Sequence, residues 1–545
     1  MFYTPRKMIR VCSGCLIMAC FVLLFSCKDS KPTSADARLR FESIIPKPVS
    51  AAMSGSTFTL TNETMIVTEG SGNELMEVAR FLAEKIKPST GFDMKVSSGE
   101  EASSNGAILL TLEGGDEELR AEGYELSIEE DGIKIKASSP TGLFWGVQTL
   151  RQLLPEDIEK SSSVQNGVWE IATGSIRDYP EYSWRGSMLD VARHFFTVEE
   201  VKHYIDLITF YKMNTLHLHL SDDQGWRIEI KSWPNLTKIG GLSEVGGTEG
   251  GFYTQEQYAE IVEYAASRFI TIIPEIDMPG HINAALVSYK ELNPGPSINR
   301  EPGSTRNTGP KPGVVHTGIE VGFSTLDIKK EITFKFVNDV LRELAMMTPG
   351  PYLHIGGDEA AVTKKPDYIA FVNKFKEIVK ANGKKMIGWE EIAQADIDST
   401  VTVQHWDNEG YALMAAEKGA KLIFSPAKKV YLDMQYDSTT KLGLHWAAYI
   451  EVDSSYIWDP AARVPGIDPE KIQGVEAPLW SETTATMDDV EYMAFPRLPG
   501  VAEVGWTKAE NRQWNEYKIR LANQSKRWKV MDINFYRSAR VQWVD

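Results

Sequence analysis

The sequence predicts an α/β protein in two parts, a (β/α)8 TIM barrel preceded by a small α/β domain. At 545 residues the chain exceeds one average domain and can bury a large core. From about residue 183 onward, eight short apolar runs alternate with helix-like segments, which is the pattern of a (β/α)8 barrel. An open doubly wound sheet alternates in the same way and is the competing prediction.

The first part, residues 41–180, combines strand-like and helix-like segments. Residues 123–139 predict a hairpin, because apolar residues alternate on both sides of the turn Asp131–Gly132. Amphipathic patterns that end in Gly or Pro predict two helices. The remaining expected segments are strands at 58–70 and 107–112 and helices at 73–91 and 141–154.

The second part, residues 181–545, holds the barrel. Each strand candidate is a short apolar run, as expected for buried parallel strands. The eight candidates are 184–192, 215–220, 270–277, 352–359, 385–391, 401–406, 421–426 and 474–480. Helices are expected between several of them, at 197–213, 254–268, 332–347 and 368–383, and a final helix at 515–531 should pack on the barrel.

Polar residues follow the apolar strand bodies, at the end where a TIM barrel carries its active site. Seven of the eight candidates finish in acids, histidines or tryptophans, a register that random surface polarity would not keep. In chain order these are Asp190 and Arg193; His219, Asp222 and Asp223; Asp277 and His281; Asp358 and Glu359; Trp389 and Glu390; His405, Trp406 and Asp407; Trp480 and Glu482. The sequence therefore predicts one site rich in carboxylates and indoles.

Residues 1–26 have the form of a bacterial lipoprotein signal peptide. A basic stretch precedes the apolar run 15–25, which is short for a membrane-spanning helix. The following "LFSC" resembles a lipobox, which would make Cys27 the lipidated first residue of the mature chain; an ordinary signal peptide or an uncleaved anchor is the alternative. Residues 27–40 are expected to form a flexible tether, and the bacterial cell envelope, with a lipid anchor in the outer membrane, is the expected location.

Cysteine usage and charge exclude several classes of function. All four cysteines lie in residues 12–27, which leaves the mature domains without a disulfide, a thiol nucleophile or a thiolate metal ligand. The net charge of −17 argues against nucleic acid as a partner, because no basic excess is present to neutralise phosphates.

Three chemistries would use such a site. A metal hydrolase could use His217 and His219, two apart on one strand, but the other histidines of the site are scattered singly, and interior hydrogen bonding explains this pair as well. A carbohydrate-binding protein would use the indoles but has no need of adjacent acids. Glycoside hydrolysis needs both an acid for the leaving oxygen and a negative group beneath the developing charge. Asp358 and Glu359 meet that need if Gly356 and Gly357 take the chain out of the pleat.

Several motifs, in order, resemble the β-N-acetylhexosaminidases of glycoside hydrolase family 20. They are "RGSMLDVARHF", "NTLHLHLSDDQGWR", "IIPEIDMPGH", "YLHIGGDE", "VQHWD" and "APLWSE" followed by "FPRLPGVAEVGW", and they extend from about residue 182 to 506. The preceding "IIPKPVS" and "TGLFWGVQTLRQLL" look like the N-terminal α/β domain of that family. The resemblance implies an exo-acting enzyme for glycans that end in N-acetylhexosamine, with no metal or organic cofactor.

The resemblance also implies a retaining mechanism in which the substrate's own 2-acetamido oxygen attacks the anomeric carbon. Carried onto this chain, Glu359 would be the general acid and then the base. Asp358 would hold the acetamido N–H and offset the charge of the oxazolinium intermediate, while its own charge keeps Glu359 protonated. Asp277 and His281 would support Glu359 from behind. The sugar would contact Arg193 and Glu482 through its outer hydroxyls, Tyr431 through the acetamido oxygen, Asp433 through hydroxyls, and Trp389, Trp406 and Trp480 as walls.

Some alternatives remain open at this point. Arg193 could instead form a buried ion pair with Asp190, and the assignment of Tyr431 and Asp433 could slip by a residue in their turn-rich segment. The Pro/Gly-rich stretch 293–315 should lie over the mouth of the barrel. A family member with a deeper pocket would release a disaccharide, as lacto-N-biosidases do, and the sequence does not choose between GlcNAc and GalNAc.

Overall fold

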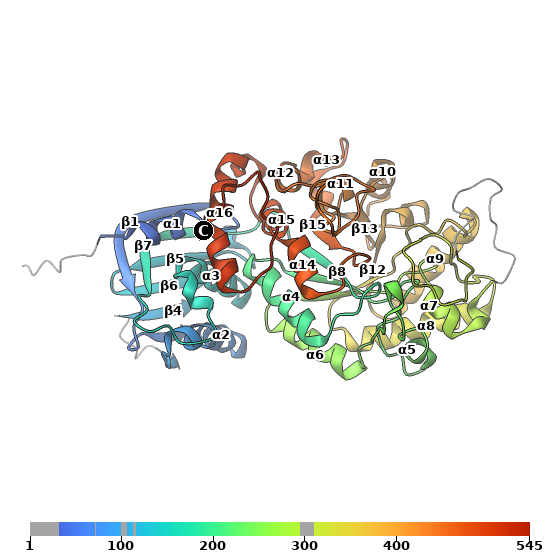
Figure 1. Ribbon diagram of the computed structural model, residues 1–545, viewed down its shortest axis with the longest axis horizontal. Coiled ribbons are helices and arrows are strands. Elements are labelled where there is room, and N and C mark those ends of the chain that lie inside the picture. Colours follow the sequence, from blue (N-terminus) through green and yellow to red (C-terminus); the bar gives the residue numbers. More distant parts are fainter. Residues whose placement is uncertain (1–31, 71, 100–105, 113–115, 295–309, 545) are drawn as a thin grey trace, which may run out of the picture.

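The computed structural model describes residues 32–70, 72–99, 106–112, 116–294 and 310–544. An N-terminal α/β unit lies beside a larger barrel, and the last helix lies between them (Figure 1). The predicted fold class is confirmed, since the second part is a closed barrel of eight parallel strands rather than an open sheet. Among the described residues, no helix is long and apolar enough to cross a membrane.

The N-terminal unit is a seven-stranded mixed sheet whose one face is covered by helices. The strand order is β1-β7-β5-β6-β4-β2-β3. The predicted hairpin is present as β5 and β6, with buried and more exposed residues alternating along both strands. The strands are β1 (Ser50–Thr59), β2 (Met65–Glu69), β3 (Val96–Ser98), β4 (Ala107–Thr111), β5 (Tyr124–Glu129), β6 (Gly132–Ala137) and β7 (Glu170–Asp178), and the helices are α2 (Asn73–Thr90) and α3 (Pro140–Leu153).

One helix of this unit, α1 (Ala35–Glu42), falls within the residues expected to form the flexible tether. Ser34 caps it by accepting a hydrogen bond from the backbone N–H of Ala37 at 3.2 Å. Ala37 and Phe41, one helical turn apart, are buried against the rest of the unit. The tether prediction for 27–40 is therefore wrong from Ala35 onward, because two apolar contacts and a cap are enough to order a polar segment.

The barrel strands occupy the eight predicted positions. Neighbouring strands are parallel throughout, and the barrel closes between β15 and β8. In chain order the strands are β8 (Trp184–Asp190), β9 (Thr215–His219), β10 (Thr271–Glu275), β11 (Tyr352–His354), β12 (Lys385–Trp389), β13 (Thr402–His405), β14 (Lys421–Phe424) and β15 (Ile472–Leu479).

The four helices predicted between the strands are also present. α4 and α6 each begin with a capping box, from Thr197 with Glu200 and from Thr254 with Gln257, which satisfies backbone N–H groups at both helix starts. The helices of the barrel are α4 (Val198–Phe210), α5 (Asn235–Lys238), α6 (Gln255–Ala266), α7 (Asn283–Ser288), α8 (Glu331–Met347), α9 (Lys365–Ala381), α10 (Glu409–Glu417), α11 (Ala427–Val430), α12 (Val452–Tyr456), α13 (Pro460–Arg463), α14 (Met487–Ala494), α15 (Arg497–Trp506) and α16 (Trp514–Val530).

A buried polar cluster joins the two parts. The fully buried Lys212 donates to Asp178 at 2.8 Å and to the Tyr124 hydroxyl at 2.9 Å. Asp178 also accepts from the Trp506 indole at 2.8 Å, and Arg185 pairs with a carboxylate of the N-terminal unit. Because Lys212 and Arg185 lie at the starts of β9 and β8, the N-terminal unit contacts the amino end of these strands and leaves the carboxyl ends of the barrel free.

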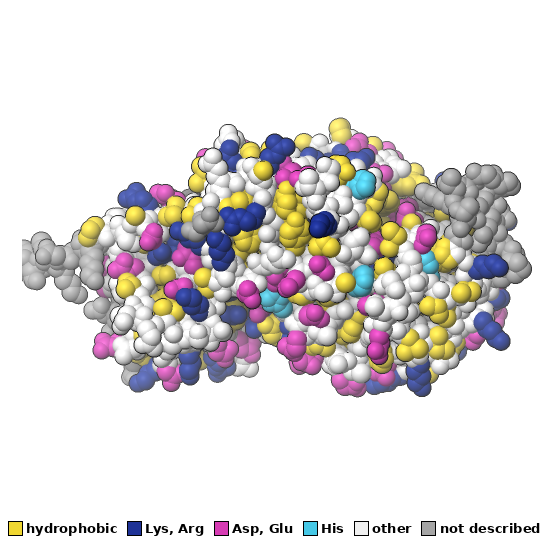
Figure 2. Space-filling model, viewed as in Figure 1, with side chains coloured by type: hydrophobic (Ala, Val, Ile, Leu, Met, Phe, Trp, Pro, Cys, Tyr) yellow, Lys and Arg dark blue, Asp and Glu magenta, His cyan; other side chains and the backbone are white. Residues whose placement is uncertain are grey.

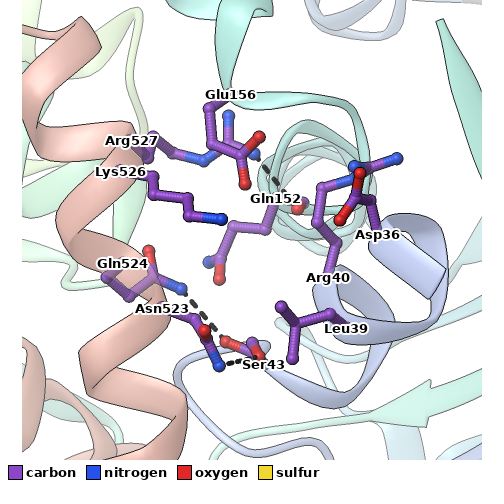
Figure 3. A pocket seen from close by; sticks show the side chains of 10 residues that line it. All are labelled: Asp36, Leu39, Arg40, Ser43, Gln152, Glu156, Asn523, Gln524, Lys526 and Arg527. Carbon is purple, nitrogen blue, oxygen red and sulfur yellow. Dashed lines mark hydrogen bonds between the residues drawn. The ribbon is translucent and has the colours of Figure 1, made fainter. Parts of the chain in front are cut away.

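The helix α16 packs on both parts rather than on the barrel alone. It lines a small polar cavity at the junction with α1 and α3, where Gln524 donates to the carbonyl of Ser43 at 3.0 Å and Arg527 donates to the carbonyl of Leu154 at 2.7 Å (Figure 3). These polar groups bind one another, so this cavity reads as an interface between the parts. On the face of the molecule in Figure 2, acidic and basic side chains are interspersed.

Candidate active site

The two adjacent acids lie on a loop just past β11, at the carboxyl end of the barrel. β11 ends at His354, and Gly356 and Gly357 follow with φ of 66° and 99°, which glycine adopts at low cost. A Cβ on Gly356 would lie 1.9 Å from Asp277 Oδ1, so this position has no room for a side chain. The prediction that the glycines take Asp358 and its neighbour out of the pleat is confirmed.

Glu359 itself has a left-handed backbone, with φ of 44°. His281, which faces it from the loop after β10, has φ of 48°. Non-glycine residues rarely adopt this conformation, and such strain gathers at functional sites, where the surrounding fold holds it in place. The two strained residues approach each other, with His281 Nε2 3.6 Å from Glu359 Oε2.

Asp358 is held from behind by Asp277. Asp277 Oδ1 accepts the backbone N–H of Gly357 at 2.9 Å, and its second oxygen shares a hydrogen bond with the Asp358 carboxyl. Burial and the nearby Asp358 raise the pKa of Asp277 well above its usual value, so Asp277 carries the proton of this pair. Burial also raises the pKa of Asp358, while His281 and the proton from Asp277 oppose that rise. Asp358 is thus the charged member at neutral pH.

Arg193 combines both of the roles considered for it. Its guanidinium pairs with Asp190 at 3.1 Å and with Asp222 at 2.8 Å, and it lies over the Trp480 ring at 4.9 Å. These carboxylates raise the pKa of Arg193 well above its usual value, against the opposing effect of burial. Its Nε nevertheless faces the same pocket as Glu482.

These residues line one pocket of about 270 Å³. The polar lining comes from residues that follow β8, β10, β11, β14 and β15, as expected for a site at the carboxyl end of a TIM barrel. The lining residues are Arg193, His281, Ile319, Val321, Asp358, Glu359, Trp406, Tyr431, Asp433, Leu444, Trp446, Trp480 and Glu482.

An aromatic cluster forms one wall of the pocket. Trp480 packs against Trp389 and Tyr431, with ring centroids 5.7 and 6.3 Å apart. Trp389 is 1% exposed and lies behind the lining residues, where its indole N–H donates to Glu275 at 2.8 Å. Trp406 is partly exposed at the rim and donates its indole N–H to Glu391 at 3.3 Å. All three tryptophans predicted as walls are brought to one place.

Several buried polar atoms of the pocket point into it without a partner. Among the described residues, no hydrogen-bond partner is present for Arg193 Nε, His281 Nε2, Asp358 Oδ1, Asp433 Oδ1 or Glu482 Oε2. Buried polar atoms are nearly always satisfied in folded proteins, so a group of orphans around one space indicates a polar ligand. Apolar rings beside donors and acceptors are what a sugar ring with its hydroxyls requires.

Comparison with known proteins agrees with this geometry. Residues 182–509 match the family model described as "Glycosyl hydrolase family 20, catalytic domain", and residues 42–179 match "Glycosyl hydrolase family 20, domain 2". The chain belongs to glycosyl hydrolase family 20. It is therefore a glycoside hydrolase, with the fold that the family resemblance implied.

Individual members of family 20 are similar over nearly the whole chain. A beta-N-acetylhexosaminidase from Cellulomonas fimi is 39% identical over 506 residues, which are 92% of this chain and 97% of that protein. The structure of the GH20 beta-N-acetylhexosaminidase from Streptomyces coelicolor has 47% identity and a TM-score of 0.86, with 94% of this chain and 100% of that chain covered. A mutant Streptomyces plicatus beta-hexosaminidase in complex with the product GlcNAc gives 46%, 0.86, 94% and 99% for the same quantities.

Sequence reasoning missed the apolar rim of this family 20 site. Ile319 and Val321 line one part of the mouth, and Leu444 and Trp446 line another. Trp446 is 56% exposed and its ring centroid lies 6.0 Å from that of Trp406. Its place in "GLHWAAYI", a loop far from any strand end, gave no periodic signal, although an indole among small residues in a loop was a hint. Of the stretch 293–315, residues 295–309 lie outside the described residues.

His217 and His219, the pair that had suggested a metal site, bind carboxylates inside the barrel. His217 Nδ1 lies 2.8 Å from Glu476, and His219 Nδ1 lies 2.5 Å from Glu275. His217 and Glu275 also approach His354 closely enough for the three to share a cation. Their nitrogen and oxygen atoms already meet directly at hydrogen-bond distances of 2.9–3.0 Å. Interior hydrogen bonding, the alternative reading of the pair, describes this geometry.

Proposed function

We propose that this family 20 protein is an exo-acting, retaining β-N-acetylhexosaminidase that removes terminal β-GlcNAc or β-GalNAc from the non-reducing end of glycans. The observation that carries the proposal is the pocket in which Asp358, Glu359 and the indole wall surround five unpartnered polar atoms. The names of the similar proteins from Cellulomonas fimi and Streptomyces coelicolor support the same activity.

In the first step, Glu359 gives its proton to the leaving oxygen as the bond from that oxygen to the anomeric carbon breaks. The electron pair for the new bond comes from the acetamido carbonyl oxygen of the substrate, which attacks the same carbon and forms the oxazolinium ring. Asp358 accepts the acetamido N–H and stabilises the positive charge, a role suited to the charged member of its pair with Asp277. Tyr431 is placed on the pocket wall to hydrogen-bond the acetamido oxygen.

In the second step, Glu359 takes a proton from water, and the hydroxide that results attacks the anomeric carbon. The bond to the acetamido oxygen breaks, and two inversions at one carbon leave the β configuration unchanged. His281, 3.6 Å from Glu359, supports the acid in both directions of proton transfer.

Exo action follows from what closes the pocket. Arg193, Asp433 and Glu482 lie on its inner part, and like-charge proximity to Glu482 together with burial raises the pKa of Asp433 well above its usual value. Such carboxylates are stabilised by donors, and the hydroxyls of a terminal sugar would supply them. The disaccharide-releasing alternative is not favoured, since the similar structures include a complex with GlcNAc itself.

The decisive experiment is hydrolysis of 4-nitrophenyl β-GlcNAc and β-GalNAc, with the first-formed sugar observed by NMR. We expect the β anomer to form first, and we expect Glu359→Gln to lower kcat by roughly 100-fold or more. The matched control is Glu417→Gln, an exposed acid on α10, which should have no effect. Release of only the α anomer, or full activity of Glu359→Gln, would refute the proposal. EDTA should leave the rate unchanged, and loss of activity would revive the metal hydrolase.

We also propose that the mature chain is held in the cell envelope by a lipid on Cys27. The basic stretch, the apolar run 15–25 and "LFSC" support this, and all of them lie outside the described residues. Mass spectrometry of the N-terminal peptide of membrane-extracted protein should find Cys27 acylated, and Cys27→Ala should move the activity to the soluble fraction. An unmodified N-terminus at another residue would exclude the anchor.

A further inference from the structure

An unbroken line of alternating carboxylates and imidazoles runs from the interior of the barrel to the catalytic loop. It passes through β15, β9 and β10 and then through the loops that follow β9 and β10, and each contact has been measured between facing atoms. The successive distances are Glu476–His217 2.8 Å, His217–Glu275 3.0 Å, Glu275–His219 2.5 Å, His219–Asp222 2.9 Å, Asp222–His281 3.2 Å and His281–Glu359 3.6 Å.

Burial makes this line costly unless every charge is paired. Each member before Glu359 is at most 2% exposed. Ions at such depth are stable only where opposite charges and hydrogen bonds compensate the loss of water. Strict alternation supplies that compensation: neighbouring carboxylates raise the pKa of His217 to about 9 and of His219 to about 10, and the imidazoles help to lower the pKa of Glu275 well below its usual value.

Asp222 is the point where this line meets the active site. One of its oxygens contacts His219 and Arg193, and the other contacts His281. The contact to His281 Nδ1 fixes the direction in which the opposite nitrogen, Nε2, points. That nitrogen faces Glu359, so an error in the position of Asp222 would be passed to the general acid.

We infer that Glu275 and His219 are positioning residues for the general acid: they hold Asp222, and through it His281, in the orientation that faces Glu359. The inference rests on the proposed function, because it assigns residues that act through Glu359. It requires no movement of protons along the line. Glu275 serves the other side of the site as well, since its second oxygen accepts the indole N–H of Trp389 behind the aromatic wall.

The structure supplies a matched control in His354. Like His219, it is a buried histidine whose Nδ1 meets Glu275, here at 2.9 Å. Unlike His219, it lies on a side branch that does not continue to Asp222. A change at either position disturbs Glu275 and the barrel interior, but only a change at His219 interrupts the line to the acid.

The test compares two substrates that depend differently on the acid. A 2,4-dinitrophenyl leaving group departs with little protonation, whereas a methyl group needs the proton of Glu359. We expect His219→Gln and Glu275→Gln to lower kcat/KM on the methyl glycoside at least about tenfold more than on the dinitrophenyl glycoside. We expect His354→Gln to lower both rates by the same factor.

Equal losses on both substrates for His219→Gln would overturn the inference, since a merely loosened barrel would slow both reactions alike. If His219→Gln or Glu275→Gln fails to fold, the isosteric Glu476→Gln at the inner end of the line carries the test, with the same selective loss expected and equal losses again counting against it. A wild-type enzyme inactive on the dinitrophenyl glycoside would refute the proposed function instead, which keeps the two failures distinct.

Discussion

Asp277 Oδ1 accepts the backbone N–H of Gly357 at 2.9 Å, and this bond ties the end of β10 to the loop that carries both catalytic acids. The same carboxyl carries the proton that it shares with Asp358. Asp277 therefore acts as a neutral donor and acceptor, a role that an amide can also fill.

We accordingly expect Asp277→Asn to keep kcat/KM within about tenfold of the wild type. Asp277→Ala should lose roughly 100-fold, because the Gly357 N–H and Asp358 would both lose a partner and the loop would shift. Steady-state kinetics on 4-nitrophenyl β-GlcNAc distinguish the two variants. Equal losses would mean that Asp277 acts through its negative charge.

The raised pKa of Asp433 predicts an unusual dependence of stability on pH. Burial and the nearby Glu482 favour the protonated form in the folded state, so the stabilising contribution is complete at low pH and is lost as pH rises through the folded pKa. Asp433→Asn mimics the protonated form at every pH. Its free energy of unfolding should exceed that of the wild type by roughly 1–2 kcal/mol at pH 8, and the difference should vanish near pH 3.

Urea unfolding of the ligand-free enzyme at both pH values measures this difference. Glu417→Gln, an exposed acid on α10, is the control and should change neither value. The Asp433 variant should be nearly inactive while being more stable, because the site has exchanged stability for binding. A variant that is less stable at pH 8 would contradict the expectation.

The exposed indole at the mouth predicts an effect on the departing half of the substrate. Trp446→Ala should raise KM roughly 5- to 10-fold for a disaccharide of two GlcNAc units, whose second ring lies at the rim. It should leave KM for methyl β-GlcNAc unchanged. Tyr449→Ala is the matched control, since this residue of the same loop is 47% exposed and stacks on His445, outside the pocket lining. Equal effects of both variants would point to a general disturbance of the loop.

The buried ion pair between the two parts predicts that they unfold together. Lys212→Met leaves Asp178 charged and buried, which should cost about 3–5 kcal/mol in the free energy of unfolding. Lys87→Met removes a pair whose side chains are 61% and 88% exposed, and its cost should stay below about 1 kcal/mol. Chemical denaturation followed by tryptophan fluorescence measures both. Similar costs would show that the junction is not a stabilising contact.

The sequence predicted the barrel well because its strands are short apolar runs that end in polar residues. The same rule located every acid, arginine and tryptophan assigned to the site, since these residues follow strands directly. Residues whose role depends on three-dimensional neighbours were not predicted. Glu275 reads as one polar residue at the end of an apolar run, and its contacts with His217, His219 and His354 arise only when β9, β10 and β11 lie side by side.

The helix α1 was missed for a different reason. Its composition is polar, and only Ala37 and Phe41 are buried, so no apolar stripe marks it in the sequence. Trp446 was missed because loops have no periodicity that would tell a rim residue from a surface residue. In both cases a single tertiary contact decides the outcome.

The closing pair of the barrel, β15 and β8, has a consequence for how activity arises during synthesis. Arg193 follows β8 and Glu482 follows β15, so the two groups that hold one sugar are separated by most of the barrel sequence. A nascent chain that already contains Asp358 and Glu359 still lacks the strand that completes the ring and half of the grip on the substrate. Hydrolysis therefore begins only once nearly the whole polypeptide has emerged, and a chain cut between these strands keeps its acids but has no pocket in which to use them.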